Sequence, residues 1–532
     1  MNSFKLFTSA AAALLVLAGC GGGSGPVTPP APVPAPEPIP TPAPPTPTPP
    51  PDPVPAPPPA PGPVLPPAPG PVLPADALTR WNMCAVPRTG VDANKLPFPD
   101  KQGTLADELY FIRAWINRFY LWYDEVPTKY DPGTAFAHAA DYFNVLKTPI
   151  ITPSGKPKDN YHFTYPSERW DALNTKGVDV GYGVTWSRNA GANLPRTWLA
   201  TTVEPGSPAA AAGLRRGDLL ATVDGVDFIN AGDSASVAQI NAGLFPVTAG
   251  ESHRLIVRRG DASIDAALVS ASVATVPVKN TQVIDTPTGK VGYLTFGSHN
   301  AVSELQLIES VTQFKAAGVS DLVLDMRYNG GGLLFIASEL AYMIAGPDAT
   351  AGKVFEQPIH NDKTKLQPAL TFRSTAYGFP APVQAQAGRE LPYLGLKRVT
   401  ILTTPGTCSA SESVINSLRG VDVEVNLIGG ATCGKPYAFT PLPNCGTTYF
   451  SIEFKGVNNK GFGDYADGMA PTCSVPDDLS HEIGDPAEGM LAAALSYRVR
   501  NACPAALAQR SKAVAMQLVR PPAEEISIYT RR

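Results

Sequence analysis

The sequence is poor in charged residues and in histidine, and each shortage excludes a class of function. Charged residues make up 17% of the 532 residues, the formal net charge is -4, and no basic run of the kind seen in nucleic-acid readers occurs. We therefore expect no nucleic-acid partner. The six histidines are scattered, and neither His-Glu-x-x-His nor Cys-x-x-Cys spacing occurs, so we expect no metal site and no cofactor.

The amino terminus lacks an apolar run long enough to span a bilayer stably. Lys5 precedes a short apolar run over residues 10–17, which leads into Leu-Ala-Gly-Cys at Cys20. This pattern predicts a lipoprotein signal peptide at 1–19, with cleavage before Cys20 and lipidation of that cysteine. Because Gly21 rather than aspartate follows, we expect a lipid anchor in the cell envelope, in the outer membrane, facing the periplasm or the surface.

Residues 20–76 contain almost no charge and are mostly proline, alanine and valine after the first glycines. Such a composition cannot bury a core and favours an extended polyproline II segment. At roughly 3 Å per residue, this linker would reach on the order of 150 Å from the membrane. It is either a passive linker or a spacer whose length matters to function.

A candidate nucleophile follows the β-branched run at 398–404 and the turn Pro405-Gly406. After Ser409, apolar residues recur at helical spacing, so Ser409 should stand where a strand turns into a helix. The free N–H groups of a first helical turn can stabilise an oxyanion. The same Ser-Ala-Ser-Glu segment is also a capping box, with Ser409 as N-cap and Glu412 reaching back to it.

Two further segments favour chemistry at Ser409 over simple capping. Lys435 follows the apolar run 423–428 and the turn Gly429-Gly430, and a buried lysine can lose its proton and act as a general base for a serine. The run 322–332 reads as a buried strand that ends in Arg-Tyr-Asn-Gly-Gly-Gly and continues into a helix over 333–344. Glycines there let backbone amides approach a substrate.

With these motifs, residues 100–495 resemble the carboxyl-terminal processing (tail-specific) proteases, peptidase family S41. The resemblance rests on Arg327 to Gly332, Ser409 to Glu412, and Gly434-Lys435. It implies that Ser409 is the nucleophile, that Lys435 is the general base, and that the N–H groups of Ala410 and Gly331 bind the oxyanion. It also implies a ClpP/crotonase-like α/β core.

One position departs from this family. Many members carry a glutamine four residues after the lysine, where it orients the amine, and this sequence has Phe439 there. The third catalytic position therefore stays open among Asp422, Glu412 and Tyr437.

Residues 178–273 resemble a PDZ domain, through Val203 to Asp218 followed by Ala221 to Gly225. The loop Gly181-Tyr182-Gly183-Val184 is similar to the carboxylate-binding loop of that family. Its backbone amides would receive a peptide carboxylate, while the peptide adds as a strand to the sheet edge. The alternative is that these glycines only form a hairpin.

The predicted organisation has six parts. They are a signal peptide (1–19), the lipidated cysteine and linker (20–76), an amino-terminal helical region (77–175), a mainly-β PDZ-like domain (176–275), an α/β protease core (276–500) and a tail (501–532). In the helical region, apolar residues at helical spacing predict helices over 105–123 and 135–146, whose aromatic stripe we assign to the core.

Besides Cys20 there are six cysteines, at 84, 408, 433, 445, 473 and 503. An even number in a compartment that permits disulfides makes three bridges plausible, and six cysteines allow 15 pairings. We expect one bridge to tether Cys84 to the region of Cys503. Next to Ser409, Cys408 is either bridged or a buried thiol.

These observations favour a serine endopeptidase with a Ser409–Lys435 dyad, acting on unfolded polypeptides near flexible carboxyl-terminal tails. The alternative is a catalytically inactive envelope lipoprotein that uses its PDZ-like domain to hold peptides or partner proteins. An esterase with a Ser-His-Asp triad is disfavoured, because Ser409 lacks a Gly-x-Ser-x-Gly frame.

Overall fold

The computed structural model describes residues 73–92, 95–133, 136–189, 194–365, 367–504, 516–519 and 527–528. The predicted signal peptide, Cys20 and nearly all of the proline-rich linker lie outside these residues. In the described part of the chain, no helix combines the length and the apolar composition needed to cross a membrane.

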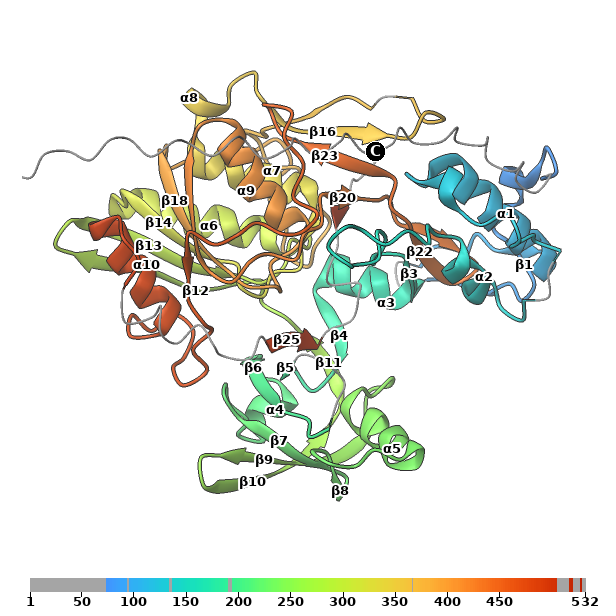
Figure 1. Ribbon diagram of the computed structural model, residues 1–532, viewed down its shortest axis with the longest axis horizontal. Coiled ribbons are helices and arrows are strands. Elements are labelled where there is room, and N and C mark those ends of the chain that lie inside the picture. Colours follow the sequence, from blue (N-terminus) through green and yellow to red (C-terminus); the bar gives the residue numbers. More distant parts are fainter. Residues whose placement is uncertain are drawn as a thin grey trace, which may run out of the picture. The chain divides into compact units, whose positions relative to one another are not determined.

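A six-stranded sheet organises the carboxyl-terminal half of the chain (Figure 1). Its order is β12 (Val278–Thr286), β13 (Gly289–Phe296), β14 (Asp321–Asp325), β18 (Arg398–Thr403), β19 (Glu424–Gly429) and β24 (Cys473–Ser474). Only β12 runs antiparallel to its neighbour; the other pairs are parallel. All five residues of β14 are buried, as expected for a strand covered on both faces.

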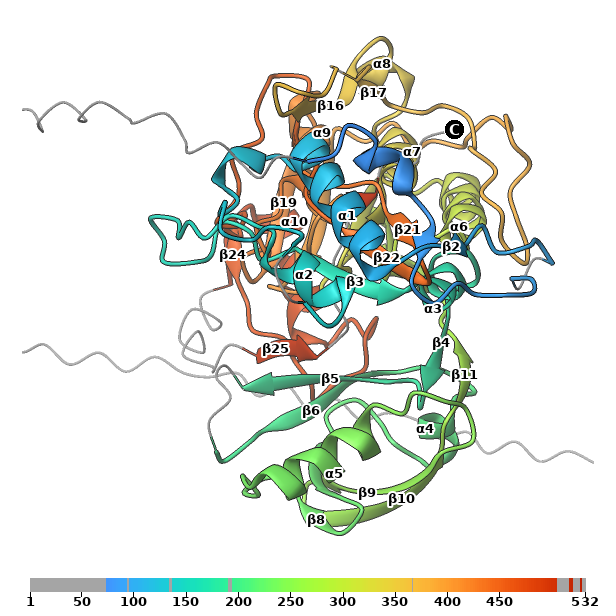
Figure 2. The same cartoon turned by 90° about the vertical axis from the view of Figure 1, so that its right-hand side faces the viewer.

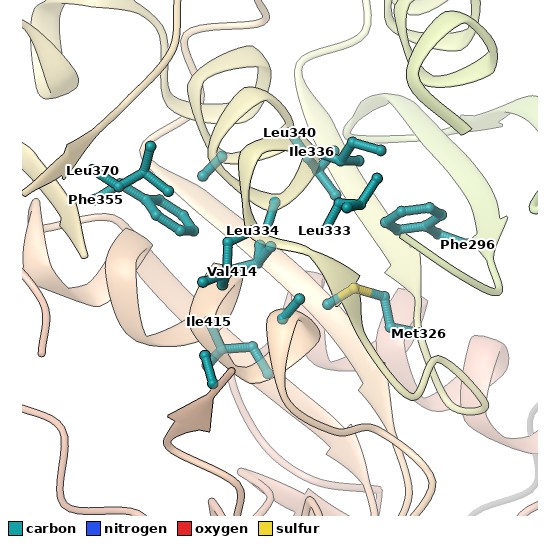
Figure 3. Close-up of a cluster of buried hydrophobic side chains, with 14 of the residues drawn as sticks. Phe296, Met326, Leu333, Leu334, Ile336, Leu340, Phe355, Leu370, Val414 and Ile415 are labelled. Carbon is teal, nitrogen blue, oxygen red and sulfur yellow. The ribbon is translucent and has the colours of Figure 1, made fainter. Parts of the chain in front are cut away.

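Helices cover both faces of this sheet. On one face lie α6 (Ser303–Ala317), α7 (Leu334–Ala345) and α9 (Ala410–Gly420), which share one hydrophobic core with the sheet, and α8 (Pro347–Thr350) follows α7. Figure 3 shows part of this core, with residues of α7 and α9 packed together. On the other face, α10 (Gly489–Arg500) packs against Tyr293 and Val323. Because successive side chains of a strand point to opposite faces, the sheet contributes residues to two separate hydrophobic cores.

Two smaller sheets extend this α/β core. One has the order β17 (Leu370–Thr371), β16 (Val354–His360), β23 (Phe454–Val457) and β20 (Tyr437–Ala438). The other joins β21 (Leu442–Asn444) and β22 (Thr447–Phe450) to β3 (Phe163–Pro166). Through β3, the amino-terminal region shares a sheet with a segment that follows Lys435.

The amino-terminal region is built around α1 (Leu105–Phe119). Thr104 and Asp107 cap it reciprocally: the carboxylate of Asp107 accepts from the Thr104 N–H at 2.9 Å. The aromatic stripe of α1 is buried, as the spacing predicts. The region also contains η1 (Ala77–Arg80), β1 (Met83–Cys84), β2 (Lys101–Gln102), η2 (Tyr123–Glu125), α2 (Ala139–Val145), α3 (Ser167–Asp171) and η3 (Ala172–Lys176).

The PDZ-like segment begins and ends at a paired strand, because β4 (Val178–Gly181) pairs with β11 (Ala271–Ala274). Between them, a second sheet has the order β10, β9, β7, β6, β5 and β25, with β8 beside β7. The bounds are β5 (Val184–Asn189), β6 (Trp198–Val203), α4 (Pro208–Ala211), β7 (Leu219–Val223), β8 (Val226–Asp227), α5 (Ser234–Leu244), β9 (Ser252–Arg259) and β10 (Ala262–Val269).

Two strands come from the segment that we treated as a tail. β25 (Met516–Val519) pairs with β5, and β26 (Ser527–Ile528) pairs with β15 (Gly332–Leu333). We predicted no strand in these residues, although Ala513 to Val519 is an uncharged run and 525–529 alternates between polar and apolar residues.

The six cysteines form three bridges: Cys84–Cys445, Cys408–Cys433 and Cys473–Cys503. The expected tether between Cys84 and the region of Cys503 is wrong. Cys84 follows the start of the amino-terminal region, which packs beside the β21–β22 hairpin, and Cys445 stands in the turn of that hairpin. Cys503 instead follows α10 and bridges to β24.

Candidate active site

The three predicted motifs follow three neighbouring strands of the main sheet. The glycine motif follows β14, Ser409 follows β18, and Lys435 follows β19, and these strands are adjacent in the order β14-β18-β19. Because the strands are parallel, all three loops leave the same edge of the sheet. That edge is where α/β sheets place their ligands.

Ser409 stands at the amino end of α9 in a strained conformation. Its φ is 61° and its ψ is -115°, in a region that serine rarely adopts, and the residue is completely buried. Such backbone strain costs about 1–3 kcal/mol and occurs mainly where function requires it. In the described part of the chain, the N–H of Ala410 donates to no protein acceptor, so it is available at the start of the helix.

The turn that carries Ser409 is fixed to the glycine motif by hydrogen bonds. The carbonyl of Asn329 accepts from the Cys408 N–H and from the Ser411 hydroxyl, each at 3.0 Å. The Thr407 hydroxyl donates to the Met326 carbonyl at 2.8 Å. The nucleophile turn and the end of β14 therefore form one rigid unit.

Glu412 and a disulfide bring the lysine loop to this turn. One carboxylate oxygen of Glu412, Oε2, accepts from the N–H of Ser409 at 2.9 Å and from the N–H of Lys435 at 2.8 Å. The other oxygen accepts from the Gly434 N–H at 2.9 Å and the Thr432 hydroxyl at 2.5 Å. Burial raises the pKa of Glu412, and these donors partly offset that effect.

The amine of Lys435 is enclosed by aromatic rings. Only 1% of the residue is exposed, and its Nζ lies 4.3 Å from the ring centre of Tyr161 and 4.6 Å from that of Phe439. Removal from water disfavours the charged amine, whereas the ring faces favour it. Phe439, which replaces the family's glutamine, thus lies beside the amine. Tyr161 comes from the amino-terminal region, and no sequence motif marked it.

The structure separates the three candidates for the third catalytic position. Asp422 is 82% exposed in its side chain and forms an ion pair with Lys460, so it is excluded. Glu412 binds backbone N–H groups of both motifs, which makes it a positioning residue. Tyr437 lies edge-on to Trp122 at 5.0 Å between ring centres and is half-buried.

Within the glycine motif, the N–H of one glycine already has a protein acceptor. The N–H of Gly331, expected to bind the oxyanion, donates to the side-chain oxygen of Asn329 at 2.9 Å. This N–H is therefore already engaged by a protein acceptor, and a role of Gly331 in binding the oxyanion stays a prediction. Among the described residues, the N–H of Gly330 donates to no protein acceptor. It is the better candidate from this motif.

His299 supports the same asparagine and was missed by the sequence analysis. Its Nδ1 lies 3.1 Å from the Asn329 side-chain oxygen, and its backbone N–H donates to the Gly331 carbonyl at 2.9 Å. Burial lowers the pKa of His299 to about 3, so the ring is neutral at ordinary pH. The scattered histidines gave no spacing from which this contact could be predicted.

The only grouping of metal-ligand side chains among the described residues is Cys408, Glu412 and Cys433. Because both cysteines are in one disulfide, they offer no thiolate to a metal. This cluster is therefore structural.

The predicted peptide-binding loop borders the PDZ-like sheet at the start of β5. Gly183 has a φ of 76°, and a Cβ there would lie 2.4 Å from the Cβ of Ser207, so only glycine fits. The ring of Tyr182 is buried in the hydrophobic core of the domain, and its hydroxyl donates to the Gly243 carbonyl at 3.0 Å. Only backbone groups of this loop can therefore meet a peptide at Tyr182. Gly181 ends β4, and Val184 begins β5.

Comparison with known proteins identifies both modules. Residues 290–458 match the model of peptidase family S41, and residues 199–259 match that of the PDZ domain. The chain thus contains one segment similar to peptidase family S41 and one similar to PDZ domains. The matches include Arg327 to Gly332, Ser409 and Lys435, the positions on which the resemblance rested.

Related proteins agree with this assignment. The chain is 27% identical over 266 residues to a carboxyl-terminal-processing protease of Picosynechococcus sp., covering 49% of this chain and 56% of that one. It is 26% identical over 272 residues to the chloroplastic C-terminal processing peptidase of Tetradesmus obliquus, covering 46% and 55%. The chain therefore spans about half the length of the curated relatives that it matches.

A solved structure is similar to most of the described chain. It is that of a Bacteroides fragilis protein assigned to the S41 proteases, with a TM-score of 0.56 and 25% identity. The alignment covers 74% of this chain and 97% of that chain. The two proteins thus share a fold over most of this chain.

Proposed function

We propose that the protein is a serine endopeptidase in which Ser409 attacks peptide carbonyls and Lys435 is the general base. The observation that carries this proposal is the double acceptor role of Glu412, whose Oε2 binds the backbone N–H groups of both residues. A carboxylate that served only to cap α9 would have no need to bind the lysine loop. The S41 match and the strained backbone of Ser409 support the same conclusion.

The reaction follows from these positions. Neutral Lys435 takes the proton of Ser409 as the hydroxyl oxygen attacks the carbonyl carbon. The N–H groups of Ala410 and Gly330 stabilise the oxyanion. The lysine then gives the proton to the leaving amine, and the carbonyl carbon remains bonded to the serine oxygen. Water, deprotonated by Lys435, hydrolyses this ester and restores the serine.

We further propose that the substrates are unfolded proteins or flexible carboxyl-terminal tails, captured by the PDZ domain along the edge at β5. The core would be of the ClpP/crotonase-like kind, and the region before β3 would act as its helical cap. A lipid anchor at Cys20 would hold the enzyme in the cell envelope, in the outer membrane, with residues 20–76 as a spacer.

The test is digestion of an unfolded reporter protein with an apolar carboxyl-terminal tail. We expect the wild type to cleave it and Ser409→Ala and Lys435→Ala to leave it intact. Activity should rise with pH, because only the neutral amine accepts the serine proton. If no form cleaves while tail binding persists, the alternative of an inactive peptide-binding lipoprotein is favoured.

A further inference from the structure

The edge of the PDZ sheet that should receive a peptide is already paired with the chain itself. β25 runs antiparallel to β5, with Leu518 opposite Ser187 and Val519 opposite Trp186 (Figure 2). This strand addition at the edge that begins with Val184 is the way in which PDZ domains bind peptides.

Neighbouring side chains of β25 contact two different parts of the protein. Val519 packs against the hydrophobic core of the PDZ domain. The Cδ1 of Leu518 lies 2.5 Å from the point that a Cβ on Gly406 would occupy, so it rests on the turn that leads to Ser409. Gln517, which lies between Met516 and Leu518, is exposed. Because consecutive residues of a strand point to opposite faces, Val519 and Leu518 hold the strand from both sides.

The second tail strand lies beside two catalytic motifs. β26 pairs in parallel with β15, with Ser527 opposite Gly332, directly after the glycine motif. It also contacts β20, which begins two residues after Lys435. The backbone of β26 therefore lies next to the segments that directly follow the glycine motif and Lys435.

A cavity of about 970 Å³ joins these places. Gly183 of the PDZ loop, Gly331 and Gly332 of the glycine motif, and Leu518 and Val519 of the tail all line it. A peptide captured by the PDZ domain and extended toward the glycine motif would meet the tail at both ends.

We propose that the two tail strands, Met516–Val519 and Ser527–Ile528, act as a built-in peptide ligand, which competes with polypeptide substrates for the PDZ groove and the active-site cleft. The part of this proposal that concerns the cleft rests on the proposed protease function, whereas occupancy of the PDZ edge does not. A tethered ligand acts at an effective concentration on the order of 1 mM. With a Kd on the order of 0.1 mM, it would leave about one molecule in ten open.

The test compares Leu518→Asp with Gln517→Asp in the full chain. Both variants add the same charge to the same strand, but only the first disrupts the contact with Gly406. Hydrogen exchange of the β5 amides, measured in a Ser409→Ala background, should accelerate about tenfold in Leu518→Asp and stay unchanged in Gln517→Asp. With Ser409 intact, Leu518→Asp should lower the KM for the unfolded reporter by about tenfold with little change in kcat.

A second variant guards against a folding defect. A chain ending at Pro504 removes both tail strands and keeps the Cys473–Cys503 bridge. We expect it to match Leu518→Asp in exchange, and a synthetic peptide of residues 512–528 should restore slow exchange at β5. The proposal is overturned if the β5 amides exchange at the same rate in the chain with the unaltered tail, in Leu518→Asp and in the truncated chain. It is also overturned if the added peptide does not slow exchange at β5. If β5 exchange is faster in the variants but no form cleaves the reporter, the tail is still a ligand of the PDZ domain, and the proposed protease function is wrong.

Discussion

Cys408 and Cys433 are joined by a disulfide, with their Cα atoms 5.2 Å apart. Cys408 directly precedes the proposed nucleophile, and Cys433 stands two residues before the proposed base. The bridge therefore links the loop after β18 to the loop after β19 at the point where both reach the site. Glu412 makes the same link through hydrogen bonds.

Removal of this bridge should impair catalysis in addition to stability. We expect Cys408→Ser with Cys433→Ser to lower the free energy of unfolding by about 3 kcal/mol and kcat by at least about tenfold. The matched control is Cys473→Ser with Cys503→Ser, because the two bridges span 25 and 30 residues. It should lose similar stability and retain turnover. Equal loss of kcat in both pairs would contradict a role for the first bridge in positioning.

Substitution of Glu412 by glutamine should separate positioning from binding. The amide offers one acceptor oxygen where the carboxylate offers two, and its NH₂ group would face backbone donors. We expect Glu412→Gln to lower kcat by about a hundredfold with little change in KM. The exposed Glu309→Gln is the control. Kinetics on the unfolded reporter check this, and a wild-type kcat would exclude Glu412 as the link between the two motifs.

Glu356 should make stability depend on pH. It is buried behind α9, where its Oε2 accepts from the Ser413 hydroxyl at 2.8 Å, and burial raises its pKa to about 7. The pKa of Glu356 is higher in the folded protein than its unfolded value of 4.5. Its contribution to the free energy of unfolding is therefore fully present below about pH 4.5 and is lost as the pH rises to about 7. This shift corresponds to about 3 kcal/mol.

The glutamine of Glu356→Gln cannot ionise, so this variant should not lose stability through this group as the pH rises. We expect its Tm to equal that of the wild type near pH 4.5 and to exceed it at pH 8, with the same Ser413 contact kept. Glu309→Gln again provides the control, since that side chain is exposed. Thermal unfolding across this pH range is the measurement. Parallel Tm curves for wild type and Glu356→Gln would show that Glu356 does not titrate as described.

The sequence predicted the elements that depend on local patterns. The strands before Ser409 and Lys435 and the helices after the glycine motif and Ser409 lie within a few residues of their predicted positions, because β-branched runs, turns and helical spacing act locally. The family motifs also indicated that their loops lie together. The order β14-β18-β19 gives the physical reason, since adjacent parallel strands deliver their loops to one edge.

Contacts between distant segments could not be predicted in this way. Tyr161 beside the amine, His299 beside Asn329 and the pairing of Cys84 with Cys445 each depend on how far-apart segments pack. The hydrogen bond from the Gly331 N–H to the side chain of Asn329 was not predicted either, because it depends on the exact turn that the glycines form. The tail strands were missed because their pairing partners lie about 200 to 330 residues away in the chain.

The most direct test of the central claim is covalent labelling of the full chain with a serine-directed phosphonate, followed by mass spectrometry of the peptides. We predict one added group per chain, located on Ser409, and slower labelling in Lys435→Ala. Ser417→Ala, which removes another buried hydroxyl of α9, should label like the wild type. Labelling that persists in Ser409→Ala, or its absence from the wild type with the tail removed, would contradict Ser409 as the nucleophile.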